Sequence, residues 1–199
     1  MKIYDFEQYS EAWYQIRIGK PTSSGFDNII TPTGKPSTQA KKYMYQLAGE
    51  AILGKCEETY QSEAMLRGKE LEAEARKYYE FLKNTEVKQI GFCVHDTINC
   101  GASPDGLVEK GGLEIKCPKL STHIEYLINN ELPNKYFVQT QGQMFVAGLK
   151  WVDFFSYYPG IKPLMIRVEP DKDFQNKLKE ELITFCDRLK DLINKLKEV

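Results

Sequence analysis

Two acids and a lysine stand close together in the middle of this sequence. Asp105 lies in a turn-forming run, SPDGL, and Glu114 and Lys116 alternate with apolar residues in the run LEIKC. The alternation predicts a strand with Glu114 and Lys116 on one face and Ile115 on the other. Glycines in a hairpin loop over 109–112, with Val108 near Leu113, would fold Asp105 back beside that charged face. We therefore expect Asp105, Glu114 and Lys116 to meet at one point.

The chemistry of that point follows from its charges. Two carboxylates roughly 4 Å apart repel each other by about 4 kcal/mol at an effective dielectric constant near 20, and Lys116 can offset only part of this. A divalent cation such as Mg2+ or Mn2+ suits carboxylate and water ligands, and it can activate water to cleave a phosphodiester. Lys116 would then orient or help to deprotonate that water. The alternative interpretation is a surface hairpin whose strand carries an ordinary salt bridge.

A third acid is indicated by the long helix that we expect from about Ser62 to Leu82. Its apolar stripe is formed by every third or fourth residue, namely Ala64, Gly68, Leu71, Ala75, Tyr78 and Leu82. Glu72 falls at the edge of this stripe, where a partly desolvated carboxylate needs a partner. It is either a structural glutamate bonded to a neighbour or a third metal ligand.

The remaining elements predict an α/β (α+β) fold in which helices flank a central mixed sheet. Periodicity and capping residues predict further helices over 10–19, 24–30, 37–54, 121–130, 135–148 and 171–199. Strand-like segments lie at 87–94, 100–107, 113–117, 151–158 and 164–168. The last helix has an apolar residue every three or four positions, and we expect it to pack on the domain and cover a sheet.

Composition bounds the class of protein without naming a function. With 199 residues, 42% of them hydrophobic and 28% charged, the chain suits one globular domain over 1–199. A formal net charge of −1 gives no global basic field, so any contact with nucleic acid must be local. The five cysteines are scattered, which predicts reduced thiols. Without a signal sequence or a membrane-length apolar run, we expect a cytoplasmic protein with no membrane association.

Four short motifs, in this order, resemble one nuclease family. They are AWYQIRIG followed by TSS at 12–24, RGKELE at 67–72, SPDG with EIKCP at 103–118, and YFVQTQGQM at 136–144. Asp105 with Glu114-x-Lys116 has the form of the PD-(D/E)xK motif. Together the four motifs resemble the phage lambda exonuclease branch of that superfamily, the YqaJ-type viral recombinases. The resemblance implies a restriction-endonuclease-like core.

The resemblance also implies roles for individual residues. Mg2+, or Mn2+ in its place, would be held by Glu72, Asp105, Glu114 and the backbone carbonyl of Ile115, while Lys116 positions the attacking water. Contacts to DNA and to its terminal 5′-phosphate would come from four side chains, Arg17, Ser24, Ser103 and Gln139, with Gln141 as a second choice for the glutamine. On residue types alone, Arg17 is a surface cation, the serines are helix caps and the glutamines face solvent.

The function implied by the resemblance is a Mg2+-dependent 5′-to-3′ exonuclease acting on double-stranded DNA ends. Such an enzyme leaves 3′ single-stranded overhangs for phage-type recombination, forms a ring of three subunits and works with a single-strand annealing protein. It would act in the cytoplasm of a bacterial host, encoded by a phage or prophage. Two alternatives stay open: an endonuclease or junction resolvase of the same superfamily, and a non-catalytic protein that binds DNA ends or keeps the motif only as a salt-bridge cluster.

Overall fold

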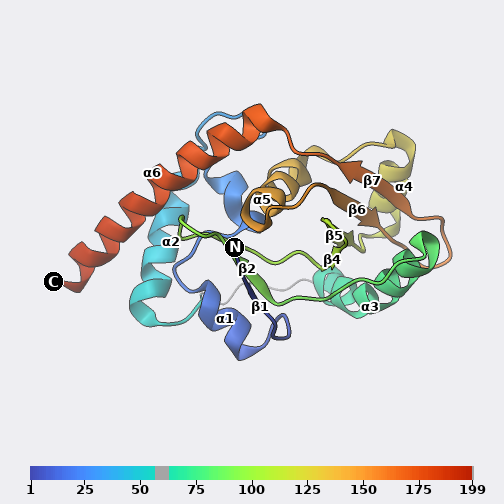
Figure 1. The fold of residues 1–199 in the computed structure, drawn as a ribbon, viewed down its shortest axis with the longest axis horizontal. Coiled ribbons are helices and arrows are strands. Elements are labelled where there is room, and N and C mark those ends of the chain that lie inside the picture. The colour runs from blue at the N-terminus through green and yellow to red at the C-terminus, as the bar shows by residue number, and fades with distance from the viewer. Residues whose placement is uncertain (57–62, 199) are drawn as a thin grey trace.

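The computed structural model describes residues 1–56 and 63–198 and is shown in Figure 1. Its helices are α1 (Glu11–Arg17), α2 (Ala40–Leu53), α3 (Glu63–Lys83), α4 (Leu120–Asn129), α5 (Phe137–Ala147) and α6 (Lys172–Lys197), with two 3-10 helices, η1 (Ser23–Asn28) and η2 (Asn134–Tyr136). Its strands are β1 (Lys2–Tyr4), β2 (Phe92–Val94), β3 (Gly101–Ala102), β4 (Gly106–Val108), β5 (Gly111–Lys116), β6 (Val152–Ser156) and β7 (Leu164–Val168). The mixed α+β class is confirmed.

The strands form two sheets where the sequence predicted one. The larger sheet has the order β4-β5-β6-β7, and only its β5–β6 pair is parallel. A parallel pair needs a crossover connection, and here the chain between β5 and β6 supplies α4, η2 and α5. The smaller sheet has the order β1-β2-β3. Lys88, which precedes β2 in the chain, forms a backbone bridge with Leu107 of β4. The helix α5, which belongs to the crossover connection, lies in the middle of the molecule (Figure 1).

The two faces of the larger sheet have different covers. On one face, Ala75 and Tyr79 of α3 pack against Leu113 and Ile115 of β5. On the other face, α4 and α5 pack against β6 through a cluster that includes Tyr126, Met144 and Phe154. Glu114 and Lys116 point to this second side because side chains alternate along β5. The predicted split between a charged face and an apolar face of this strand is confirmed.

The β4–β5 hairpin is tighter than the sequence suggested. Its loop is only Glu109 and Lys110, and Glu109 adopts a left-handed backbone with φ of 52°. Val108 pairs with Gly111 and not near Leu113, so that expectation was wrong. Gly111 is the first residue of β5, and it must be glycine because a Cβ there would lie 2.2 Å from the Trp151 ring. The true register continues from the Gly106–Leu113 pair and sets Asp105 beside Glu114.

The buried stripe of α3 also differs from the prediction. Ala75 and Tyr79 are fully buried, whereas Tyr78 and Leu82 are exposed. The predicted start of the helix at Ser62 lies outside the described residues. The stripe that faces β5 is rotated toward Tyr79, and Glu72, three residues before Ala75, lies on it and not at its edge. Glu72 is thus carried toward the β4–β5 hairpin.

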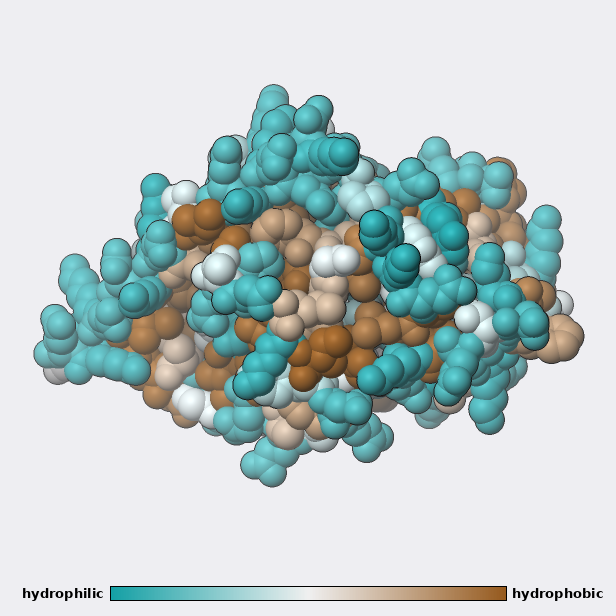
Figure 2. Space-filling model, viewed as in Figure 1, coloured by the Kyte–Doolittle hydropathy of each residue, from teal (hydrophilic) through white to brown (hydrophobic). Residues whose placement is uncertain are grey.

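The C-terminal helix α6 packs on helices. Its side chains Phe174, Leu178, Leu182, Phe185 and Leu189 are buried in a core cluster shared with α2, α5 and η1. Each buried side chain of this kind stabilises the fold by about 1.5–3 kcal/mol. The expectation that α6 packs on the domain is confirmed, but its main contact is α2 and not the face of a sheet. In Figure 2 hydrophilic side chains cover α6 and the rim of this face, while hydrophobic ones reach the surface in its middle.

Across the described part of the chain, none of the helices combines the length and the apolar character needed to cross a membrane. All five cysteines are free thiols, as their scattered spacing predicted.

Candidate active site

Glu114 lies at the centre of a small polar cluster on β5. Its side chain is buried, with 1% of the residue exposed, and both carboxylate oxygens accept hydrogen bonds. Oε1 accepts from Gln139 Nε2 at 2.6 Å and pairs with the ammonium group of Lys116. Oε2 accepts from Gln143 Nε2 at 2.5 Å. Strand β5 thus supplies a carboxylate and an ammonium group two residues apart, and α5 supplies two amides that fix the carboxylate.

Asp105 precedes β4 and joins this cluster through the hairpin. Its Oδ2 accepts a 2.6 Å hydrogen bond from the backbone N–H of Ile115, which fixes the carboxylate against β5. Burial raises the pKa of Asp105 well above its ordinary value, and the charges of Glu114 and Glu72 raise it further. Lys116 and the bond from Ile115 oppose this rise in pKa without cancelling it. Asp105 is therefore a desolvated acid that a cation would stabilise in its ionised form.

Lys116 remains a charged donor in this setting. Burial alone lowers the pKa of its ammonium group, but Glu114 and Asp105 outweigh burial and raise that pKa above the ordinary value. The same ammonium lies 5.2 Å from the centre of the Tyr136 ring. A lysine held in this state is suited to orient a water molecule by donating to it, and not to remove its proton.

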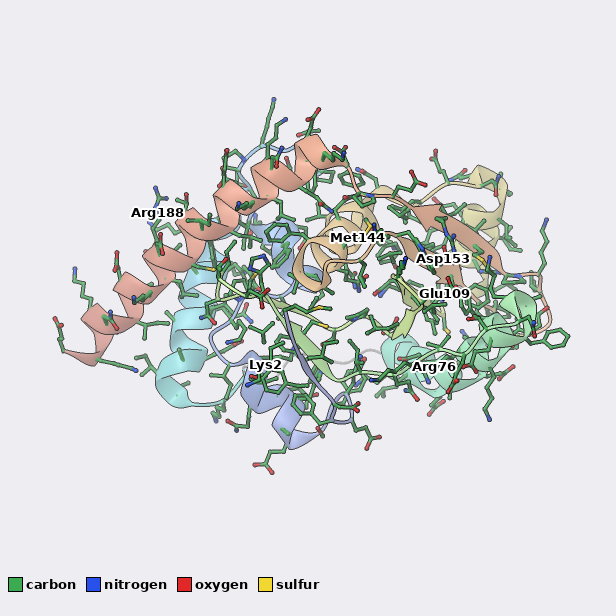
Figure 3. The ribbon with its side chains drawn as sticks, in the orientation of Figure 1. Lys2, Arg76, Glu109, Met144, Asp153 and Arg188 are labelled. Carbon is green, nitrogen blue, oxygen red and sulfur yellow. The ribbon has the colours of Figure 1, made fainter. Side chains whose placement is uncertain are left out.

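Glu72 comes to the same region from α3. Its Oε1 accepts from Arg76 Nη2 at 2.5 Å, and the two residues are one helical turn apart (Arg76 is labelled in Figure 3). Burial raises the pKa of Glu72; Arg76 lowers it, and Glu114 raises it again. The structure thus brings Glu72, Asp105 and Glu114 close enough to repel one another, from a helix and a hairpin.

The residues of this site fit a hard divalent cation by their chemistry. Three carboxylates that repel each other in a partly desolvated place are the ligands that Mg2+ and Mn2+ take. Within residues 1–56 and 63–198, however, no group of three or more His, Cys, Asp or Glu side chains is already arranged to hold a metal ion. Protein donors occupy the oxygens instead, namely Lys116, Gln139 and Gln143 on Glu114, and Arg76 on Glu72. A bound cation would displace the cationic donors Lys116 and Arg76. Gln139 and Gln143 can stay, because each carboxylate oxygen has a second lone pair.

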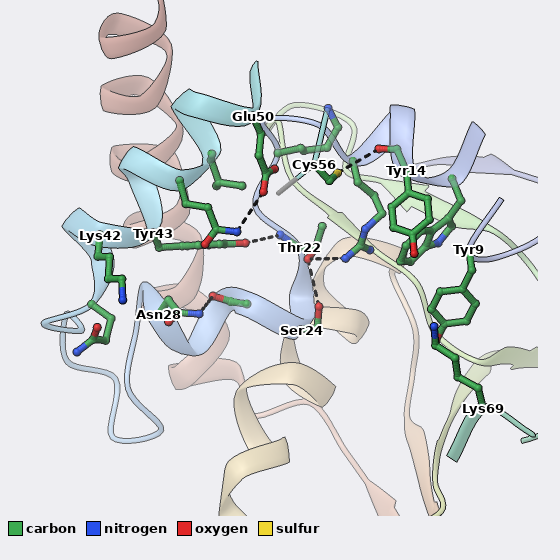
Figure 4. A pocket seen from close by; sticks show the side chains of 17 residues that line it. Tyr9, Tyr14, Thr22, Ser24, Asn28, Lys42, Tyr43, Glu50, Cys56 and Lys69 are labelled. Carbon is green, nitrogen blue, oxygen red and sulfur yellow. Dashed lines mark hydrogen bonds between the residues drawn. The ribbon is translucent and has the colours of Figure 1, made fainter. Parts of the chain in front are cut away.

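Arg17 lines a separate cleft beside this cluster, a cavity of about 560 Å³ that Figure 4 shows from close by. Its Nη1 donates to Ser103 Oγ and its Nη2 to Thr22 Oγ1, both at 3.4 Å. Thr22 Oγ1 lies 3.2 Å from Ser24 Oγ. Three hydroxyl groups thus gather around one guanidinium, at the end of α1, the start of η1 and the segment before Asp105.

Arg17 has no acidic partner in the part of the chain that the structure describes, since no carboxylate there forms a salt bridge with it. Its guanidinium lies over the Trp13 ring at 4.0 Å, and burial lowers its pKa. A guanidinium fork that is partly desolvated, surrounded by hydroxyls and open to a cleft is a good receptor for phosphate oxygens.

The glutamines of α5 correct one sequence-based expectation. Gln139 faces Glu114, but Gln141 does not enter the site. Its Nε2 donates to the carbonyl of Glu169 at 2.9 Å, and its Oε1 accepts from the backbone of Asp171, so it holds the connection between β7 and α6. A step of two residues on a helix turns the side chain about 200°, away from the first glutamine.

Gln143 was not among the site residues predicted from the sequence. It is four residues after Gln139, so both side chains share the face of α5 that covers β5. That spacing was the available signal, because two amides one turn apart can grip the two oxygens of one carboxylate. Thr22 was missed in the same way, as one of several hydroxyls before η1.

Another buried acid, Asp153 on β6, belongs to the scaffold. Its oxygens accept from Arg167 Nε at 2.8 Å and from the Tyr79 hydroxyl at 2.8 Å, on the face of the sheet that α3 covers (Figure 3). It ties β6, β7 and α3 together and takes no part in the cluster around Glu114.

Comparisons with known proteins identify a family and relatives with the same fold. A family model described as YqaJ-like viral recombinase domain matches residues 12–150. The crystal structure of an alkaline exonuclease, LHK-Exo, from Laribacter hongkongensis is 34% identical, covers 95% of this chain and 97% of that one, and superposes with a TM-score of 0.86. A structure of LHK-Exo in complex with dAMP gives a TM-score of 0.85 at the same coverage. A phage related exonuclease from Haemophilus somnus 129PT is 18% identical, with a TM-score of 0.71 over 89% of this chain and 96% of that one, and shares the fold. No curated protein matches.

Proposed function

This chain belongs to the YqaJ-like viral recombinase family, and we propose that it is a metal-dependent exonuclease that digests double-stranded DNA from its ends in the 5′-to-3′ direction. The relative LHK-Exo, 34% identical over nearly the whole chain, is an alkaline exonuclease. The observation that carries the proposal is the meeting of Asp105, Glu114 and Lys116 on the β4–β5 hairpin.

The roles follow from the contacts of each residue. Glu72, Asp105, Glu114 and the backbone carbonyl of Ile115 would hold Mg2+, or Mn2+ in its place. Such an ion supplies a nucleophilic water at neutral pH and neutralises charge on the phosphodiester. Lys116 would release Glu114 and donate to the attacking water, and Gln139 would keep Glu114 oriented or contact the substrate. A cation held there would also reduce the repulsion between the acids and the DNA phosphates.

Arg17 and the hydroxyls around it would select the DNA end. In this proposal Arg17, with Ser24 and Ser103, binds the terminal 5′-phosphate, since its guanidinium lacks an acidic partner within the described residues and opens to a cleft. A site for the terminal phosphate restricts cleavage to ends and sets its polarity. The products would be 3′ single-stranded overhangs, taken up by a single-strand annealing protein. We also expect three subunits to form a ring around the DNA.

A linear duplex, labelled on each 5′ end and each 3′ end in separate samples, tests activity, metal need and polarity together. We expect early release of the 5′ label as a mononucleotide, no release without Mg2+, and late release of the 3′ label. Early release of the 3′ label would reverse the proposed polarity. Cutting of covalently closed plasmid at a comparable rate would instead support an endonuclease or junction resolvase.

One observation favours a second candidate, a non-catalytic protein that binds DNA ends. Both oxygens of Glu114 already have donors, so the cluster is satisfied without a cation. Asp105→Asn separates the two candidates because the amide oxygen can still accept from Ile115. If the protein is an exonuclease, this variant keeps the fold and binds DNA ends but loses hydrolysis; if it is not, wild type and variant are equally inactive.

A further inference from the structure

Tyr9 lies between the Arg17 cleft and the acidic cluster. Its side chain lines the cavity that holds Arg17 and Ser24, and it also lines a neighbouring hollow with Glu72. Burial raises the pKa of its hydroxyl to about 12, with further contributions from the charges of Asp105 and Glu72. The ring therefore lies at the boundary between the Arg17 cleft and the acidic cluster.

The ring of Tyr9 is available to a ligand. The residue is 43% exposed, so part of the side chain is open to solvent. Its ring centre lies 5.1 Å from that of Trp13, and the Arg17 guanidinium lies 4.0 Å from the centre of the Trp13 ring. The Lys69 ammonium lies over the Tyr9 ring at 4.0 Å, as Figure 4 shows. A lysine on a flexible stem is a weak cover, and a flat ligand can displace it.

The backbone of Tyr9 is held in a conformation that its side chain does not favour. Its φ is 68°, in the left-handed region that bulky residues rarely adopt. Strain of this kind persists where the surrounding structure requires it, and it concentrates at ligand-binding positions. The turn between β1 and α1 thus fixes an aromatic ring at this place where glycine or asparagine would be easier to accommodate.

The two parts of the site are joined by a short stretch of chain. The hydroxyl of Ser103 accepts from Arg17, and Asp105 is two residues further along the chain. Two residues span at most about 7 Å, so the phosphate receptor and the acid cluster are close neighbours. An enzyme that holds the 5′-phosphate and cuts the next phosphodiester must place one nucleoside between them. The base of that nucleoside needs a surface.

Resting on the exonuclease function proposed above, we propose that Tyr9 is the subsite for the base of the 5′-terminal nucleotide, which stacks on the tyrosine ring while Arg17 holds the phosphate. Every base has a flat π face, so this subsite accepts all four bases. It would orient the first nucleotide and thereby place the scissile bond at Asp105. Lys69, displaced from the ring, would be free to meet the DNA backbone.

The test compares DNA ends that have or lack the terminal base, and it uses binding as well as digestion. Binding is measured in the Asp105→Asn background, with 5′-phosphorylated duplexes whose first nucleotide is natural or abasic. The protein with Tyr9 should bind the natural end about tenfold more tightly. Tyr9→Phe should keep that preference, and Tyr9→Asn, which suits the left-handed backbone but removes the ring, should lose it. The matched control is Tyr45→Ala, since Tyr45 is 56% exposed over Lys41 and lines neither hollow.

The outcomes separate this inference from the function on which it rests. Equal binding of natural and abasic ends by the protein that retains Tyr9 would overturn the base subsite without any variant at position 9. Equal weakening of both ends by Tyr9→Asn would show that the ring is only structural. If either of these two results is found while the wild type digests DNA ends, the exonuclease function is supported and the base subsite is refuted. If the wild type neither binds nor digests DNA ends, both the exonuclease function and the base subsite are contradicted.

Discussion

The side-chain amide of Gln143 donates a 2.5 Å hydrogen bond to Oε2 of Glu114, and neither residue is more than 1% exposed. Gln139, one helical turn earlier, donates to the other oxygen at 2.6 Å. The helix α5 therefore fixes both the position and the plane of the carboxylate on β5. Removing either amide would leave the same strand with a less constrained acid.

The variant Gln143→Leu should destabilise the protein and weaken cation binding. A buried carboxylate oxygen that loses its donor costs about 1–3 kcal/mol. The measurements are urea unfolding and Mg2+ titration by calorimetry. Gln141→Leu is the matched control, because Gln141 is equally buried on the same helix but bonds to Glu169 and Asp171. It should lose stability and keep the Mg2+ affinity of wild type; an equal loss of affinity in both variants would contradict the proposed clamp.

Asp105→Asn should abolish hydrolysis and stabilise the metal-free protein near neutral pH. The fold raises the pKa of Asp105, so ionisation destabilises the native state as pH rises above the unfolded pKa. The difference in melting temperature between variant and wild type should be small near pH 4 and grow with rising pH until Asp105 is ionised in the folded protein. Thermal melts from pH 4 to 8 without Mg2+ test this, and a difference that shrinks with pH would refute it.

Arg76→Met should enlarge the stabilisation that Mg2+ gives. Arg76 competes with a cation for Glu72, and both side chains are largely buried, with 11% and 22% of their surfaces exposed. Without Arg76, the metal-free protein loses the counter-charge of Glu72, at a cost on the order of 1–3 kcal/mol. Melts with and without saturating Mg2+ should show a larger gap than in wild type. Lys77→Met, an exposed change on the same helix, should leave the gap unaltered.

Arg17→Ala should reduce the preference for 5′-phosphorylated over 5′-hydroxyl ends by about tenfold or more, because charge-assisted bonds to phosphate are lost. Arg17→Lys should recover only part of it, since an ammonium cannot form the paired contact. The measurement is the ratio of initial digestion rates on the two ends. Lys41→Ala, on the exposed side of α2, serves as the control. An unchanged ratio in Arg17→Ala would remove Arg17 from its proposed role.

Local patterns in the sequence were sufficient to predict which hairpin residues meet and to predict most of the helices and strands. The alternation around Glu114 predicted which side chains share a face, and the spacing in α6 predicted its buried seam. The register of the hairpin was wrong because Gly111 was taken as a turn glycine, whereas it is a strand residue under Trp151. A ring more than thirty residues away decides that role, and no local pattern reveals it.

Tertiary packing decided the rest of the site. Which stripe of α3 is buried depends on Tyr79, whose hydroxyl reaches Asp153 of β6. Similarly, choosing between Gln141 and Gln143 required knowing that α5 faces β5 on one side and the start of α6 on the other. Tyr9 gave no sequence signal, because its importance lies in a backbone angle and in the two hollows that it joins.

The alternation along β5 limits how this protein can change over evolutionary time. The strand presents Glu114 and Lys116 to α5 and presents Leu113 and Ile115 to α3. A single amino acid inserted between Gly112 and Glu114 would turn Glu114 and Lys116 toward the apolar side chains of α3 and place Ile115 where the acid now lies. Lengthening is tolerable only at Glu109 and Lys110, where the chain turns in water. Homologues should therefore differ in length at that turn and never within the strand.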